Sequence, residues 1–171
     1  MAVIRASRAE SPLRAELTQR LVAELRSENN AQQPFIYIND VAQTGTHHVT
    51  VLWDAWRSLT PQQRGKVILD AFEQINPEIP PSVTIALGLT GEEARRLGLT
   101  PFKVQLLLKA DERDRRAELE ALLKAEGAFE TAEGPQLLFR TLEQADAAYQ
   151  RLQAKAPGPH WVIVQDVPRE Q

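Results

Sequence analysis

The sequence predicts a mixed α+β protein made of two consecutive modules. Three observations carry this prediction. Apolar residues recur at helical and at strand spacings along most of the chain, the first half follows the order αββαβ, and the second half follows βαββαβ. The pattern restarts after Leu99-Thr100-Pro101, which divides the chain into modules at residues 1–99 and 102–167. A chain of 171 residues is long enough for one large domain or two small ones.

The first module is expected to contain two long helices, three strands and a short closing helix. Each long helix begins where a Ser or Thr precedes a proline, Ser11-Pro12 and Thr60-Pro61, as is typical of a capped first turn. The strand over 35–38 is apolar on both sides, which predicts an internal position in its sheet. The expected elements are a helix over 12–26, strands over 35–38 and 48–53, a helix over 61–75, a strand over 83–87 and a short helix from 90 to 98. The residues expected to share its core are Leu21, Val51, Phe72 and Ile85.

The second module is expected to alternate strands with two helices. A turn at Glu133-Gly134-Pro135 separates the middle strands, and Gly127 and Pro157-Gly158-Pro159 end the helices. The expected strands lie over 104–108, 128–131, 136–140 and 161–164, and the helices follow Asp111 and Thr141. The resulting order, βαββαβ, is the ferredoxin-like order, so we expect a ferredoxin-like module over 102–167.

Composition excludes several classes of protein. The formal net charge is −3, so no overall positive field attracts nucleic acid or anionic lipid. The chain has no cysteine, which excludes disulfides, thiolate metal sites and thiol catalysis. No apolar run approaches the roughly 20 residues that span a bilayer, and charges interrupt the first residues, so no signal peptide is expected. A cytoplasmic protein of bacterial type, without membrane contact, is the expectation.

Three segments of the first module follow the pattern of a known family. His48-Val49-Thr50-Val51-Leu52 forms a strand, Arg64-Gly65-Lys66 leads into an apolar helical stretch, and Thr90-Gly91-Glu92-Glu93 follows the next strand. They resemble the BolA family, which has a strand beginning His-Phe, an Arg-His-Arg step and a Thr-Pro-Glu-Glu step on a type II KH-like core. The resemblance implies an αββαβ core over residues 12–98. Gly65 stands where the family has the histidine implicated in metal sharing with glutaredoxins, so that function is not carried over.

No catalytic or cofactor signature is present. The sequence has no Gly-x-Ser-x-Gly elbow, no phosphate-binding glycine loop and no His-Glu-x-x-His pair, so we expect neither enzymatic activity nor a cofactor. His47 and His48 are neighbours on a strand and point to opposite faces, which opposes joint metal binding. Charges at strand ends, Asp40 and Asp54 among them, are expected to be solvated.

An apolar patch is expected on the second module. Both helices of a ferredoxin-like module cover one face of its sheet, and strand alternation then places every second residue on the other face. Patches of about a few hundred Å2 seldom stay exposed on monomers, so we expect this face to be covered by the first module or by a second copy of the chain. The residues expected to form the patch are Leu107, Leu138, Trp161 and Ile163.

The function expected from the sequence is that of a non-enzymatic binding or regulatory protein. It is expected to act through a protein partner or by forming a homo-oligomer. Nucleic-acid binding through a local basic patch at Arg64 and Lys66 is the alternative and is less favoured. The charge balance opposes it, and the sheet of the second module lacks the aromatic residues on which bases would stack.

Overall fold

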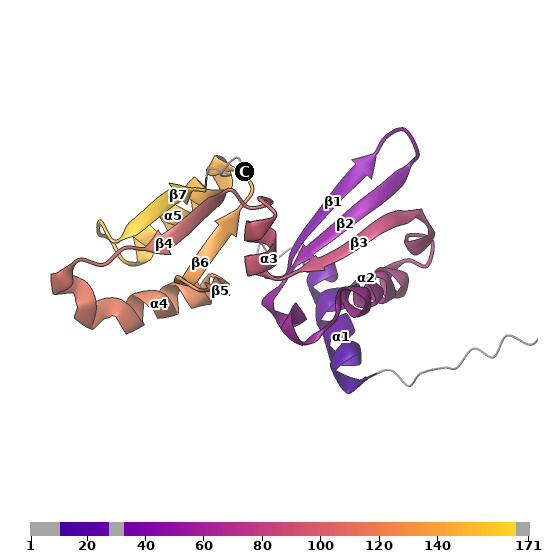
Figure 1. Cartoon of the computed structure of the whole chain (residues 1–171), viewed down its shortest axis with the longest axis horizontal. Helices are drawn as coiled ribbons and strands as arrows, with labels where there is room; N and C mark the ends of the chain where they lie inside the picture. The colour runs from indigo at the N-terminus through magenta and orange to yellow at the C-terminus, as the bar shows by residue number, and fades with distance from the viewer. Residues whose placement is uncertain (1–10, 28–32, 167–171) are drawn as a thin grey trace, which may run out of the picture.

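The chain folds into two β-sheets, each packed against two helices (Figure 1). The structure is a computed structural model that describes residues 11–27 and 33–166. Five α-helices and seven strands lie within these residues. The α+β class predicted from the sequence is therefore confirmed. Among the described helices, none combines the length and hydropathy needed to cross a membrane.

The first sheet has the strand order β1-β2-β3. β1 runs antiparallel to β2, and β3 runs parallel to β2. Helices α1 and α2 pack against one face, and α2 begins with a capping box in which the Thr60 and Gln63 side chains each bond the backbone of the other. The bounds are α1 Pro12–Arg26, β1 Phe35–Val41, β2 Thr46–Leu52, α2 Pro61–Ile75 and β3 Val83–Leu89, with short 3-10 helices η1 at Asp54–Ser58 and η2 at Pro80–Ser82. Both long helices match the predicted ranges.

The first core lies between this sheet and its two helices. Leu21, Val51 and Phe72 are buried together there, as the sequence predicts. Ile85 is not part of the core, because 47% of it is exposed. A bulge explains the difference: His47 pairs with Val83 but His48 pairs with Ile85, which leaves one extra residue in β3. The extra residue reverses the alternation, so Ile85 turns away from the helices.

β1 occupies the edge of the first sheet, which corrects the predicted internal position. An unbroken apolar run predicts apolar surroundings on both faces of a strand. Such a run does not indicate how many neighbouring strands a strand has in its sheet. Four consecutive residues of β1, residues 37–40, are exposed, and two of them, Tyr37 and Ile38, are large and apolar.

The second sheet has the order β5-β6-β4-β7, and all its neighbouring strands are antiparallel. Helices α4 and α5 cover one face, where Val104, Leu119 and Leu152 are fully buried. The first strand lies two residues earlier than predicted, and a 3-10 turn precedes α4. The bounds are β4 Phe102–Leu106, η3 Ala110–Arg115, α4 Arg116–Ala125, β5 Phe129–Thr131, β6 Gly134–Phe139, α5 Leu142–Lys155 and β7 Trp161–Gln165.

The side chains of β7 point to the opposite faces of the sheet from those predicted. Trp161 and Ile163 pack into the core beneath the helices, and Trp161 is only 2% exposed. The reason is the register: Ile163 pairs with Val104, which faces the helices, and directly paired residues share a face. The Trp161 indole N–H also finds an acceptor there, the carbonyl of Ala156 at 2.8 Å. The sequence alone does not fix this register.

Candidate functional site

A short helix, α3 (Gly91–Arg96), lies between the two sheets and joins the modules (Figure 1). Its Ala94 is buried in a third apolar cluster together with residues of both modules. Gly91 allows this packing, since a Cβ atom there would lie 2.5 Å from the Phe129 ring. We call this cluster the junction; its buried members are Leu52, Leu89, Ala94, Phe129 and Leu138.

Polar contacts surround the junction, and Asp54 is at their centre. Its carboxylate accepts the backbone N–H of Gly91 at 3.3 Å and that of Glu130 at 2.9 Å. The Gln33 side chain accepts the backbone N–H of Asp54 and donates to the carbonyls of Gly127 and Ala128. Asp54 is thus a structural acceptor rather than the solvated charge that its position at a strand end predicts. No local sequence signal marks it, because its donors lie 37 and 76 residues away.

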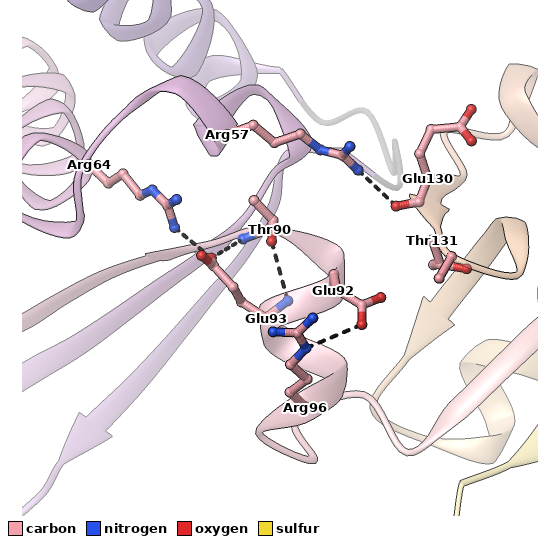
Figure 2. Close-up of a pocket in the computed structure, with 9 residues that line it drawn as sticks. Arg57, Arg64, Thr90, Glu92, Glu93, Arg96, Glu130 and Thr131 are labelled. Atoms are coloured by element: carbon pink, nitrogen blue, oxygen red, sulfur yellow. Dashed lines mark hydrogen bonds and ion pairs between the residues drawn. The ribbon is translucent and has the colours of Figure 1, made fainter.

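An open pocket of about 510 Å3 lies beside the junction (Figure 2). Its side chains come from η1, α2, α3 with its N-cap, and β5 with the residue that follows it, so both modules form it. Arginines and glutamates alternate around it, and most of them bond one another or the backbone. The lining residues are Arg57, Arg64, Thr90, Glu92, Glu93, Arg96, Glu130, Thr131 and Ala132.

Arg64 and Glu93 form an ion pair in this pocket, in which the Arg64 side chain is buried and the Glu93 side chain is 40% exposed. The Arg64 guanidinium also donates to the carbonyls of Trp56, Leu59 and Gly88 at 3.0–3.1 Å, and only 6% of the residue is exposed. Burial would raise the pKa of Glu93. The hydrogen bonds from Arg64 and from the backbone N–H of Thr90 outweigh it, so the pKa of Glu93 lies below its ordinary value.

These contacts determine what the pocket can do chemically. Glu93 is held ionised near neutral pH and therefore does not serve as a proton donor. The Thr90 hydroxyl accepts the backbone N–H of Glu93 and caps α3. Arg57 donates to the carbonyl of Glu130 at 2.8 Å, and Arg96 pairs with Glu92. The charged groups are thus mostly used to hold η1, α2, α3 and β5 together.

The structure separates the four residues predicted to form an apolar patch. Leu138 is 2% exposed and lies in the junction with residues of the first module. Trp161 and Ile163 lie on the opposite face of the sheet, under the helices. Leu107 follows the end of β4 and is 60% exposed. The four side chains therefore do not form one surface.

The two residues of the nucleic-acid alternative also differ in their surroundings. Arg64 is buried in the ion pair with Glu93, as described above. Lys66 is exposed and contacts both carboxylate oxygens of Asp70 at 2.9 Å, one helical turn away. These two cations therefore do not share one exposed surface.

The histidines near the turn of the first sheet lie as single side chains rather than as a metal cluster. The His47 imidazole is 2.7 Å from the Asp40 carboxylate on the neighbouring strand. Within the described ranges, no group of three or more potential ligands from His, Cys, Asp and Glu comes together to hold a metal ion.

A second candidate site lies on the exposed edge strand of the first sheet. We call it the sheet end and define it as Tyr37 and Ile38 of β1. Their exposed fractions are 36% and 47%. Tyr37 faces the second module, and the Arg140 guanidinium lies 3.5 Å from the centre of its ring. Ile38 is on the opposite face of β1, because neighbouring strand residues alternate. Sequence reasoning missed this site because it placed β1 inside the sheet.

Comparisons of the chain with protein-family models, with curated proteins and with solved structures find no match. The function proposed below therefore rests on the residues and contacts just described.

Proposed function

We propose that this chain is a non-enzymatic, cytoplasmic binding protein that acts through a protein partner or a second copy of itself. The observation that carries the proposal is the sheet end, where Tyr37 and Ile38 of β1 expose large apolar side chains on an ordered β-sheet. Exposed apolar groups that gather on one element are typical of protein interfaces, whereas isolated ones are not.

The surroundings of Tyr37 support a role in binding. Its ring is fixed from one side by Arg140, a cation–π contact that joins the modules. An aromatic side chain that is already immobilised loses little conformational entropy when a partner covers it. Tyrosine is also among the residues that contribute most to binding energy at protein interfaces.

The junction pocket offers less for this purpose. Its arginines and carboxylates bond one another, so a ligand would have to break existing ion pairs to bind there. The pocket therefore supports a structural role, and a binding role is assigned to the sheet end.

We further propose that the first module is related in fold to the BolA and KH-like αββαβ units and the second to the ferredoxin-like fold. The antiparallel β1–β2 hairpin with β3 parallel to β2, covered by α1 and α2 on one face, supports the first assignment. The antiparallel order β5-β6-β4-β7 with two helices on one face supports the second.

Site-specific photo-cross-linking in the source cells tests the binding function. A photoreactive amino acid replaces Ile38 in the full chain, and in a control it replaces Glu73, an exposed residue of α2. We expect a discrete protein adduct from position 38 and none from position 73. Adducts that are absent at position 38, or equal at both positions, would contradict the proposed function.

A further inference from the structure

We propose that β1 of one chain pairs antiparallel with β1 of a second copy, so that the two first sheets become one continuous sheet. This inference rests on the proposed function and names the partner at the sheet end. It starts from the edge position of β1, whose outward backbone N–H and C=O groups have no strand beside them among the described elements.

β1 lacks the features that usually protect an edge strand. Such strands are commonly short, bulged, covered, or carry lysine or proline. β1 is seven residues long, regular in its pairing with β2, and contains neither lysine nor proline. Its one charged residue, Asp40, is paired with His47.

Other edges of the two sheets are protected. β3, at the opposite edge of the first sheet, carries the bulge described above. β5 has only three residues and its Phe129 is buried in the junction. No large apolar side chain of β7 is exposed. The contrast points to β1 as the edge that is built to accept a strand.

Exposure on both faces of β1 argues for a strand as the partner. Tyr37 and Ile38 lie on opposite faces and are both exposed. A helix or a flat surface docked on one face would cover only one of them. A strand paired in the plane of the sheet places its own side chains beside both, because directly opposite residues share a face.

The sequence of β1 is compatible with pairing to itself. The strand spans Phe35–Val41, and a two-fold axis through Ile38, its central residue, pairs the strand along its whole length. Ile38 then lies opposite its own copy, Tyr37 opposite Asn39, and Ile36 opposite Asp40. The two Asp40 carboxylates do not face each other, so no like charges are directly opposed. This closed two-fold contact is the commonest symmetry of homo-oligomers.

The solution mass of the purified full chain tests the pairing, with Ile38→Lys and Ile85→Lys as matched variants. Both isoleucines lie in the same sheet and are 47% exposed, but only Ile38 is on the proposed contact strand. We expect a dimer for the wild type, a dissociation constant raised roughly tenfold or more for Ile38→Lys, and an unchanged value for Ile85→Lys. A wild type that is monomeric at every concentration tested, or equal effects of the two variants, would overturn the pairing.

Cross-linking through introduced cysteines gives a second readout that does not depend on a destabilising charge. The chain has no cysteine, so Ile38→Cys introduces its sole thiol. Opposite residues of an antiparallel pair have Cβ atoms about 4.5–5.5 Å apart, close to the spacing that a disulfide requires. We expect a covalent dimer on oxidation of Ile38→Cys and little from Ile85→Cys. Failure of Ile38→Cys to cross-link would overturn the proposed register.

The two proposals fail differently. If the purified chain is monomeric but position 38 cross-links to another protein in cells, the self-pairing is wrong and the binding function stands. If neither experiment gives a contact, the binding function at the sheet end is wrong as well.

Discussion

The Asp54 carboxylate accepts the backbone N–H of Glu130 at 2.9 Å, across 76 positions of the chain. Asp54 begins η1, two residues after the end of β2 in the first module, and Glu130 lies in β5 of the second. The same carboxylate accepts the N–H of Gly91, at the start of α3. One side chain thus fixes β5 and α3 relative to the first sheet, and the apolar junction packs beside it.

Asp54→Ala should therefore loosen the junction. The change removes the acceptor of two backbone N–H groups, and leaving such groups without a partner costs about 1–3 kcal/mol. We expect the free energy of unfolding in urea to fall by that amount. Hydrogen exchange should accelerate at the amides of Gly91 and Glu130 and remain unchanged in the middle of α2.

Asp70→Ala is the matched control for this prediction. Asp70 is also a carboxylate with a cationic partner, Lys66, but the two residues lie one helical turn apart within α2 and do not join the modules. Exposed helical pairs of this kind contribute about 0.3–0.5 kcal/mol. If Asp70→Ala destabilises the chain as much as Asp54→Ala, the special role of Asp54 is wrong.

Glu93 should make the stability of the chain depend on pH. Its pKa in the folded chain lies below the ordinary value of 4.5, since the hydrogen bonds from Arg64 and Thr90 outweigh the effect of burial. The ionised form therefore stabilises the fold above about pH 4.5, and this contribution is lost as the pH falls through the lowered pKa. Glu93→Gln should lower the free energy of unfolding at pH 7 by about 1 kcal/mol, because the Glu93 side chain is 40% exposed and solvent screens its charge.

The difference between wild type and Glu93→Gln should shrink when the urea titration is repeated at successively lower pH below 4.5. Glu126 and Glu133 also have lowered pKa values, so part of the acid sensitivity should remain in the variant. Glu73→Gln, on the exposed side of α2, should show no comparable effect. A constant difference between wild type and Glu93→Gln from pH 7 to pH 3 would contradict the role of this ion pair.

The sequence predicts the helices better than the sheets, for a physical reason. A helix cap is a contact between residues three apart, so Ser11 and Thr60 mark the starts of α1 and α2 directly. Strand position depends instead on partners that are distant in the chain. The bulge that exposes Ile85 and the register that buries Trp161 arise from pairing with β2 and with β4. Alternation alone shows that a strand has two faces, and it does not show which face is buried.

The candidate sites also depend on contacts between segments that are distant in the chain. Leu138 was expected to turn away from the helices of its own module and to be covered, and it lies in the junction with Leu52 and Leu89. Asp54 and the exposed edge of β1 were not expected, because both are defined by which segments come together in space. The capping pattern Thr90-Gly91-Glu92-Glu93 is a contact between residues close in the sequence, so it predicts where α3 begins. That α3 lines a pocket is shown only by the structure.

Phe72→Ala and Ile85→Ala together test the corrected core of the first module. Phe72 is 5% exposed between α2 and the sheet, whereas Ile85 is 47% exposed on the other face. Truncating a buried phenylalanine costs about 3–5 kcal/mol, and a change at an exposed site usually stays within about 0.5 kcal/mol. Urea denaturation of both variants should show this contrast. A loss for Ile85→Ala that approaches the loss for Phe72→Ala would place Ile85 back in the core.

Leu138→Ala and Leu107→Ala separate a junction residue from an exposed one. Both leucines were expected to belong to one apolar patch, but Leu138 is 2% exposed among residues of both modules and Leu107 is 60% exposed. Removing a buried leucine side chain costs about 2–5 kcal/mol, including the cavity that it leaves. We therefore expect a loss in this range for Leu138→Ala and a change within about 0.5 kcal/mol for Leu107→Ala. Because Leu138 packs against the first module, its truncation should also speed hydrogen exchange at Leu89, across the junction, while Leu107→Ala leaves that amide unchanged. Equal and small effects of the two variants would show that Leu138 does not join the modules.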